Sequence, residues 1–190
     1  MKKRKFLNRC LNKMKKQLGG DVRYFKRYET IIKNKIFYNR MNDVFKEFKN
    51  KNVLDIGCHI GFFDMLISPF ANRVIGIDIV SDSIKKAQYL RNMMGIQNTE
   101  FLVKDIFKID DIFIKKYDID ALFCHAVFGN LFLQQGWEDG KKNSFLKLSK
   151  VCDIAISNGS SLEEFYDKSN ITAQKFPSYY KNNLYIIKKR

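Results

Sequence analysis

From residue 52 onward, short apolar runs alternate with segments of helical periodicity, and this alternation leaves few folds open to the chain. The apolar runs lie at residues 53–56, 73–79, 101–103, 120–127, 151–157 and 184–187. A helical segment at residues 82–94 follows the second run and ends at Gly95. Because the runs are almost fully apolar, we expect strands that are covered on both faces, as in parallel sheets. The sequence therefore predicts an α/β fold, with a doubly wound, mostly parallel sheet and helices on both faces.

The first 51 residues carry almost all of the excess positive charge. They hold 17 Lys or Arg and four Asp or Glu, a net charge of +13, whereas the other 139 residues carry +2. Within this segment Leu7, Leu11, Met14 and Leu18 recur at helical spacing and form one apolar stripe, which ends at two consecutive glycines. The sequence predicts a basic helical N-terminal extension at residues 1–51, followed by a core domain at residues 52–190.

Three roles are open for this basic helix. It lies on an anionic membrane surface, docks on phosphate backbones, or packs its stripe on the body of the protein while the charges stay in water. A second helical stretch is expected at residues 24–48, where apolar side chains recur at mostly three or four residues. We expect this stretch to cover one edge of the core and to frame the substrate entrance.

The sequence predicts neither a membrane span nor a cleaved leader. The longest stretch without a charged residue, at residues 121–137, is shorter than the roughly 20 mostly apolar residues that a bilayer span needs. Lys and Arg interrupt residues 6–18, which leaves no apolar core for a signal peptide, so a cytoplasmic protein is expected. Four cysteines stand far apart in the chain, which favours buried thiols over a metal cluster or a disulfide framework. They are Cys10, Cys58, Cys124 and Cys152.

Small and acidic residues follow the first three strands of the predicted sheet. Gly57 and Gly61 follow the first strand and let the backbone turn sharply and approach a ligand. Asp78 follows the second strand, 17 residues past Gly61, near the spacing at which an acid meets a ribose diol. Asp105 follows the third strand, where it is placed to accept from an exocyclic amine. Since ligands of such sheets bind at the carboxyl ends of the strands, these residues predict an adenosine site.

Two further residues of the glycine loop indicate which group the adenosine carries. Asp55 opens the loop and His59 stands in its middle. A carboxylate disfavours a neighbouring diphosphate, whereas it attracts an ammonium group. The expected ligand is therefore an adenosine with a cationic substituent rather than a dinucleotide.

Four segments that lie at these strands carry a resemblance to a known family. They are VLDIGCHIGFF from residue 53, RVIGIDI from residue 73, FLVKDIF from residue 101 and DALFCHAVFGNLF from residue 120. Together they resemble the motifs of the class I S-adenosylmethionine-dependent methyltransferases, over about residues 52–160. The resemblance implies a seven-stranded Rossmann-like sheet whose closing hairpin falls at residues 171–177 and 183–188. It also implies a methyltransferase that uses S-adenosyl-L-methionine as its cofactor.

The resemblance also implies a role for each matching position. The implied cofactor-binding residues are Asp55, Gly57, Cys58, His59, Gly61, Asp78, Ile79, Asp105, Ile106 and Cys124. The loop residues form the pocket for the methionine part, Asp78 binds the ribose, and Asp105 with Ile106 holds the adenine. Cys124 and His125 border the methyl group that is transferred.

The chain departs from the family pattern at several places. His59 replaces the middle glycine of the first motif, and Asn130 stands where several small-molecule members carry a histidine. His125 is therefore the candidate catalytic base, and the alternative is that it only packs at the strand end. Cys124 lacks the neighbouring Pro-Cys arrangement of pyrimidine-methylating enzymes.

The segment after the fourth strand bears on the methyl acceptor. It has no Asn or Asp followed by Pro-Pro and an aromatic residue, which argues against methylation of exocyclic base amines. Residues 129–140 are the candidate loop to close over the acceptor. Two roles are open for Trp137, stacking on a base or sugar ring and anchoring the loop, and we expect the second. Residues 157–161 offer polar groups at the same rim.

Three hypotheses about function belong to different classes. The first is a methyltransferase that acts on a small metabolite or a sugar. The second is an RNA methyltransferase whose residues 1–51 hold phosphates, with binding that falls steeply as salt rises. The third is a cofactor-binding partner subunit without catalysis.

Overall fold

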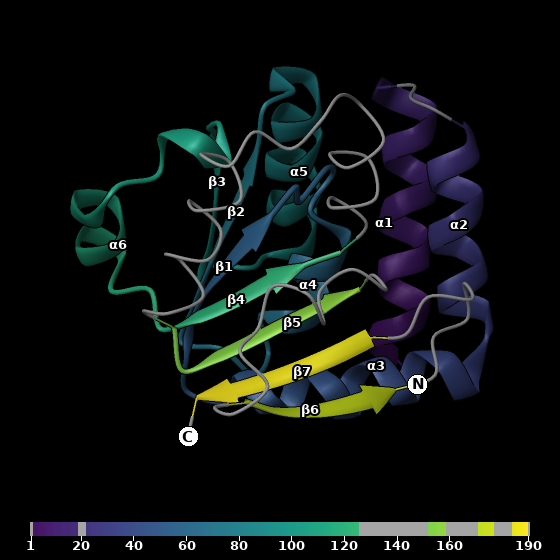
Figure 1. Cartoon of the computed structure of the whole chain (residues 1–190). Helices are drawn as coiled ribbons and strands as arrows, with labels where there is room; N and C mark the ends of the chain where they lie inside the picture. The colour runs from purple at the N-terminus through teal and green to yellow at the C-terminus, as the bar shows by residue number, and fades with distance from the viewer. Residues whose placement is uncertain (1, 19–21, 126–151, 159–170, 177–183, 190) are drawn as a thin grey trace.

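The computed structural model describes residues 2–18, 22–125, 152–158, 171–176 and 184–189 (Figure 1). Its α-helices are α1 (Lys2–Leu18), α2 (Val22–Lys33), α3 (Lys35–Phe45), α4 (Phe62–Ile67), α5 (Ser81–Met94) and α6 (Asp111–Tyr117). Two short 3-10 helices are η1 (Lys46–Phe48) and η2 (Ile106–Lys108). The strands are β1 (Asn52–Ile56), β2 (Arg73–Asp78), β3 (Thr99–Val103), β4 (Ala121–Cys124), β5 (Ile154–Asn158), β6 (Ile171–Phe176) and β7 (Leu184–Lys189).

The strands form one sheet in the order β3-β2-β1-β4-β5-β7-β6. Neighbouring strands among β1 to β5 run parallel, whereas β7 is antiparallel to both β5 and β6. The prediction of an α/β fold with a mostly parallel sheet is therefore confirmed. The chain passes from β1 outward to β2 and β3 and then returns to β4 on the other side of β1. This reversal places a topological switch point at the carboxyl ends of β1 and β4, where ligands of such sheets bind.

Alternate residues of the strands enter two separate cores. Val53 and Phe123 point to the core that helices α1 to α5 cover. Leu54, Ile75 and Leu122 point to the opposite core, which α6 covers. Figure 1 shows α6 on one side of the sheet and α1, α3 and α4 on the other. Because both faces are covered, the strands need apolar residues at nearly every position, which explains the runs in the sequence.

The apolar stripe of α1 packs on the body of the protein. Leu7, Leu11 and Met14 are at most 1% exposed, and α1 lies against α5 and α2. The basic residues of α1 that face solvent are Lys5, Arg9, Lys13 and Lys16. Of the three roles open for this helix, packing of the stripe is thus observed, and the stripe is covered rather than available to a lipid surface. The charged face is still open to an anionic partner.

No helix in the described part of the chain is both long enough and apolar enough to cross a bilayer.

The stretch predicted to be helical at residues 24–48 is helical, but it is divided into α2, α3 and η1. α2 and α3 meet at Asn34, whose N–H donates to the Thr30 carbonyl oxygen and whose own carbonyl oxygen accepts from the Tyr38 N–H. The helices change direction there because they pack on different parts of the core: Tyr28 of α2 stacks on Phe62, whereas Phe45 of α3 packs edge-on against Phe123. Tertiary contacts thus override a continuous helical period.

The ends of the other helices and strands lie closer to their predicted positions. β5 begins at Ile154 rather than at residue 151, because Asp153 lies in the preceding turn, where its N–H donates to the Asp120 carbonyl oxygen. α6 was not predicted, although the Asp110 carboxylate caps it by accepting from the Phe113 N–H at 2.8 Å. The predicted closing hairpin is confirmed as β6 and β7.

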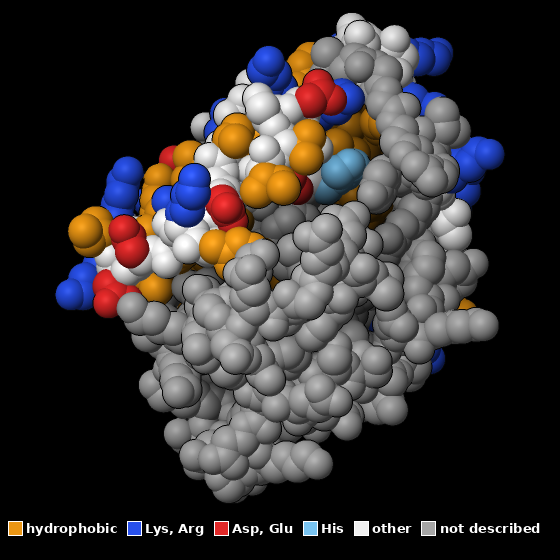
Figure 2. All heavy atoms as spheres, turned by 45° about the horizontal axis from the view of Figure 1, so that its top comes forward, with side chains coloured by type: hydrophobic (Ala, Val, Ile, Leu, Met, Phe, Trp, Pro, Cys, Tyr) orange, Lys and Arg blue, Asp and Glu red, His pale blue; other side chains and the backbone are white. Residues whose placement is uncertain are grey.

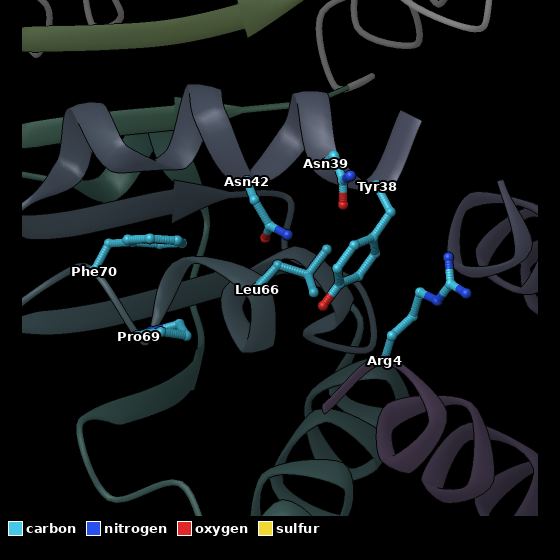
Figure 3. A pocket seen from close by; sticks show the side chains of 7 residues that line it. All are labelled: Arg4, Tyr38, Asn39, Asn42, Leu66, Pro69 and Phe70. Atoms are coloured by element: carbon cyan, nitrogen blue, oxygen red, sulfur yellow. The ribbon is translucent and has the colours of Figure 1, made fainter. Parts of the chain in front are cut away.

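A pocket of about 330 Å³ opens between α1, α3 and the end of α4 (Figure 3). Its lining residues are Arg4, Tyr38, Asn39, Asn42, Leu66, Pro69 and Phe70. Phe70 lies beside the start of β1, since its carbonyl oxygen accepts from the Asn50 N–H. This pocket is therefore at the amino edge of the sheet, away from the predicted ligand site at the carboxyl edge.

Candidate active site at the carboxyl edge of the sheet

The loop between β1 and α4 has the backbone conformation that its glycines predict. Gly57 and Gly61 have φ angles of 74° and 71°, in the left-handed region that favours glycine. The N–H groups of Gly57 and Cys58 both donate to the Ile77 carbonyl oxygen, at 2.9 and 3.0 Å, which fastens the loop to the end of β2. His59 also has a positive φ, 52°, which is uncommon for a residue with a Cβ.

The Asp78 carboxylate holds the strained centre of this loop. One of its oxygens, Oδ2, accepts from the His59 N–H at 3.0 Å, and the other, Oδ1, accepts from the Val80 N–H at 2.9 Å. Each carboxylate oxygen has a second lone pair, so both retain capacity to accept from ligand hydroxyl groups. Asp78 therefore combines a structural role in the loop with the role that was predicted for it.

Helix α2 reaches the same loop through Tyr28. The Tyr28 hydroxyl group and His59 Nδ1 are hydrogen-bonded at 3.2 Å. The Tyr28 ring stacks on Phe62 at the start of α4, with ring centroids 4.3 Å apart. Tyr28 was not among the predicted site residues, because a contact across 31 residues leaves no local pattern. The N-terminal extension thus supports the loop directly.

Two buried acids lie beneath the loop. Asp55 at the end of β1 is 2% exposed and Asp64 in α4 is 0% exposed. Burial, together with the charge of Asp64, raises the pKa of Asp55 well above its ordinary value. Burial raises the pKa of Asp64 to about 7, although its hydrogen bond with Asp55 lowers it in part. Asp64 was missed, yet a charged residue inside the apolar run of α4 was a readable signal.

Apolar side chains are exposed at the carboxyl ends of β2 and β3. Ile79 is 70% exposed, Val80 50% and Val103 55%, whereas Ile106 is buried. Asp105 Oδ1 accepts from the Phe107 N–H at 2.9 Å and so caps η2. Figure 2 looks onto this edge and shows carboxylates, a histidine and hydrophobic side chains gathered on it. Exposed apolar surface next to acceptors suits a flat base with polar edges.

Cys124 and His125 lie at the end of β4, on the other side of the loop. Cys124 pairs in register with Ile56, so it lies beside the residue that precedes Gly57. Cys124 is 1% exposed. The other cysteine near the loop is Cys58, and burial together with the charges of three acids raises the pKa of its thiol. The His125 ring packs on Phe63 at a centroid distance of 4.5 Å and is partly exposed.

The predicted site residues thus come together along one edge of the sheet, from β1, β2, β3, β4 and the segments that follow these strands. All four cysteines are buried, as expected. Within the described ranges, no group of three or more His, Cys, Asp or Glu side chains is arranged to hold a metal ion. The predicted acceptor loop at residues 129–140, with Asn130 and Trp137, lies outside the described residues, as do residues 159–161.

Comparison with known proteins assigns the chain to a family. Residues 47–184 match the family model described as "Methyltransferase domain". An uncharacterized RNA methyltransferase of Clostridium tetani is 28% identical over 85 residues, which are 45% of this chain and 19% of that protein. The chain thus spans about a fifth of the length of this curated relative.

Two solved structures share the fold at low identity. Magnesium protoporphyrin IX methyltransferase from Synechocystis PCC 6803, with bound S-adenosylmethionine, has a TM-score of 0.63 at 13% identity, over 98% of this chain and 95% of that one. An rRNA methylase from Streptococcus thermophilus has a TM-score of 0.61 at 13% identity, over 80% of this chain and 96% of that one. The glycine loop at the switch point and the family match over most of the chain agree: this chain belongs to the methyltransferase-domain family.

Proposed function

We propose that the chain binds S-adenosyl-L-methionine at the carboxyl edge of its sheet and transfers the methyl group to an acceptor. The observation that carries this proposal is the hydrogen bond between the glycine loop and Asp78 at the switch point. There the Asp78 carboxylate accepts from the His59 N–H. A loop held in this way presents backbone and acceptor atoms to a ribose. The family match supports the same chemistry.

The residues present fit this cofactor. The exposed side chains of Ile79 and Val103 offer apolar surface for the adenine, and Asp105 offers an acceptor beside them. Asp78 retains lone pairs for the ribose hydroxyl groups. The acids beneath the loop, Asp55 and Asp64, create a negative potential that suits a cationic ligand once one of them is ionised.

Methyl transfer needs alignment more than it needs acid or base chemistry. S-adenosyl-L-methionine supplies a methyl group on a positively charged sulfur, which an acceptor atom displaces directly. The chain contributes by holding the two reactants in line and by excluding water. His125, at the end of β4, is the proposed proton acceptor where the attacking hydroxyl or amine has to lose a proton. Its packing on Phe63 would orient the imidazole for that role.

Replacing Asp78 with alanine is expected to weaken the binding of S-adenosylhomocysteine by about 1–3 kcal/mol, or roughly 5- to 150-fold in Kd. The ribose hydroxyl groups lose their acceptor, and the His59 N–H loses its partner. Calorimetric titration measures the change. Asp43→Ala is the matched control, because Asp43 is an exposed acid of α3 that pairs with Lys46. Unchanged affinity in Asp78→Ala would refute the placement of the ribose, and tight NAD binding without S-adenosylmethionine binding would refute the proposed cofactor.

A small metabolite or a sugar is the first candidate acceptor. The apolar stripe of α1 is used in packing, so the basic extension has a structural reason to be present without a nucleic acid. Magnesium protoporphyrin IX methyltransferase, whose name gives a small-molecule acceptor, shares the fold over most of this chain.

RNA is the second candidate, favoured by the cations that α1, α2 and α3 leave in solvent. Besides those of α1, the exposed basic residues are Lys26, Lys33, Lys35 and Arg40. The Clostridium tetani relative is named as an RNA methyltransferase, although the match covers only part of each chain.

Methyl-labelled S-adenosylmethionine and fractionated cell extract distinguish the candidates. We expect label in the small-molecule or saccharide fraction. Label in RNA, with binding that falls linearly in log K against log salt, would establish the second candidate instead. Cofactor binding without labelled product in any fraction would indicate a partner subunit that lacks catalysis.

A further inference from the structure

Asp64 is an acid inside a fully buried helix, where apolar residues are the usual choice. It lies in the six-residue helix α4, all of whose side chains are buried. The Asp64 side chain is 0% exposed, and neither of its carboxylate oxygens receives a hydrogen bond from a donor within the described part of the chain. An ionised carboxylate in such a position is strongly disfavoured unless something compensates its charge. The role proposed so far for the glycine loop does not use Asp64.

The sheet places Asp64 next to Asp55. Asp55, Gly76 and Phe101 are in register on β1, β2 and β3, so they face the same side of the sheet. Gly76 has no Cβ, and a Cβ built there would lie 2.7 Å from Asp64 Oδ1. The Asp64 carboxyl group therefore shares with the Phe101 ring the space that a side chain at Gly76 would fill, and Asp55 stands beside Gly76 in the same row.

Asp64 Oδ1 lies over Gly76, and Asp55 is the neighbour of Gly76 in register on β1, so the two buried carboxyl groups adjoin each other. The charge of Asp64 accordingly raises the pKa of Asp55. Two carboxyl groups form a hydrogen bond only where one of them carries a proton, because an ionised carboxylate has no donor. Such a pair titrates as a unit, and its second proton is lost with difficulty. The pair is thus neutral or singly charged over the physiological range.

We propose that Asp64 is a positioning residue that acts through Asp55: the two carboxyl groups form a proton-sharing pair whose single negative charge holds the ammonium group of the methyl donor. This inference rests on the proposed function and deepens it. The pair is neutral when both carboxyl groups are protonated, and the ammonium group is then bound weakly. Loss of one proton leaves the shared-proton form with a single negative charge. This charge attracts the ammonium group strongly, because the buried site has a low dielectric constant.

Other titratable groups surround the pair. The charge of Asp78 of β2 acts on Asp55, and both acids act on the thiol of Cys58 in the loop. His59 lies on the same loop and is hydrogen-bonded to Tyr28 of α2. The neighbours from β3, β4 and α5 are the uncharged Phe101, Phe123 and Ala87. Because histidine side chains ordinarily change charge between about pH 5 and 8, the test has to separate His59 from the pair.

The test measures the Kd of S-adenosylmethionine and of 5′-methylthioadenosine between pH 5.5 and 7.5. The second ligand lacks the amino-acid part and therefore the ammonium group. In the wild-type protein we expect S-adenosylmethionine to bind about three- to tenfold more tightly at the upper pH, and 5′-methylthioadenosine to bind equally at both. Asp64→Asn, whose amide donates permanently to Asp55, is expected to remove the pH dependence. Asp43→Asn, in an exposed acid of α3, is expected to keep it.

Each outcome has a definite meaning. A pH dependence that persists in Asp64→Asn would assign it to His59 and overturn this inference alone, as would an equal dependence for 5′-methylthioadenosine. A wild-type protein that binds neither ligand at any pH would overturn the proposed function and this inference with it. If Asp64→Asn does not fold, calorimetry of the wild-type protein at pH 6 in buffers of different ionisation enthalpy replaces it. S-adenosylmethionine should then release a proton on binding, and the absence of release would overturn the inference.

Discussion

Gly61→Ala is expected to lower the free energy of unfolding by about 2–5 kcal/mol. The residue has a φ of 71°, and a side chain in this region costs about 1–2 kcal/mol. A Cβ would also lie 2.5 Å from Cζ of Phe101 and 3.1 Å from the Cβ of Ala87. Overpacking of this kind adds about 1–3 kcal/mol. Phe101 has no room to retreat, because its ring also lies against Gly76.

Gly95→Ala is the matched control for this prediction. Gly95 ends α5 with a φ of 65°, but a Cβ there meets no atom within 4 Å. The substitution should therefore lower the free energy of unfolding by only about 1–2 kcal/mol, from backbone strain alone. Denaturant titration of the two variants gives both values. Equal losses would mean that the close approach of the loop to Phe101 contributes nothing, and that the ring moves freely.

The second large effect concerns pH and the acid pair. Asp64→Asn is expected to raise the free energy of unfolding at pH 8 by about 2–4 kcal/mol relative to the wild-type protein. In the folded protein, burial raises the pKa of Asp64 to about 7 from an ordinary value of 3.8. Because the pKa of Asp64 is higher in the folded than in the unfolded protein, the carboxyl group contributes its full stabilisation below the unfolded pKa. This stabilisation is lost as the pH rises through the folded pKa. The difference between variant and wild type should therefore grow between about pH 4 and pH 7 and then level off.

Urea titrations from pH 4 to pH 8 measure this difference. Titrating groups away from the pair contribute equally to both curves and cancel in the difference. Asp55 does not cancel, because the charge of Asp64 raises its pKa in the wild-type protein only, and this adds to the difference in the same direction. Asp43→Asn should follow the wild-type curve, because Asp43 is exposed and paired with Lys46. A difference between Asp64→Asn and the wild type that does not change with pH would show that Asp64 is not a titrating buried acid.

These two predictions concern the same close-packed row of the molecule. Asp55, Gly76 and Phe101 stand side by side across β1, β2 and β3, with Gly61 and Asp64 above them. A change at any of these positions should alter both the stability of the sheet and the shape of the ligand loop. The carboxyl edge is therefore a site whose geometry depends on the core directly beneath it.

Much of the fold and of the candidate site was predictable from the sequence, for a local reason. Apolar runs in β1 to β4 indicate strands because a strand that is covered on both faces needs apolar residues at nearly every position. Gly57 and Gly61 predict a loop because only glycine adopts their backbone conformation without strain. Asp78 ends a strand and Asp105 comes shortly after one, so their place at the carboxyl edge follows from the parallel order of the sheet.

Other features depended on contacts between distant segments, which no local pattern encodes. The division of α2 from α3 follows from packing on Phe62 and Phe123, and the bond from Tyr28 to His59 joins residues that lie 31 positions apart. The sequence by itself determined the succession of the strands and the residue types at the ligand edge, because periodicity and backbone conformation are local properties. Only the tertiary structure decided that Asp64 enters the space above Gly76 and meets Asp55, because strand register and side-chain volume act together only in the folded protein.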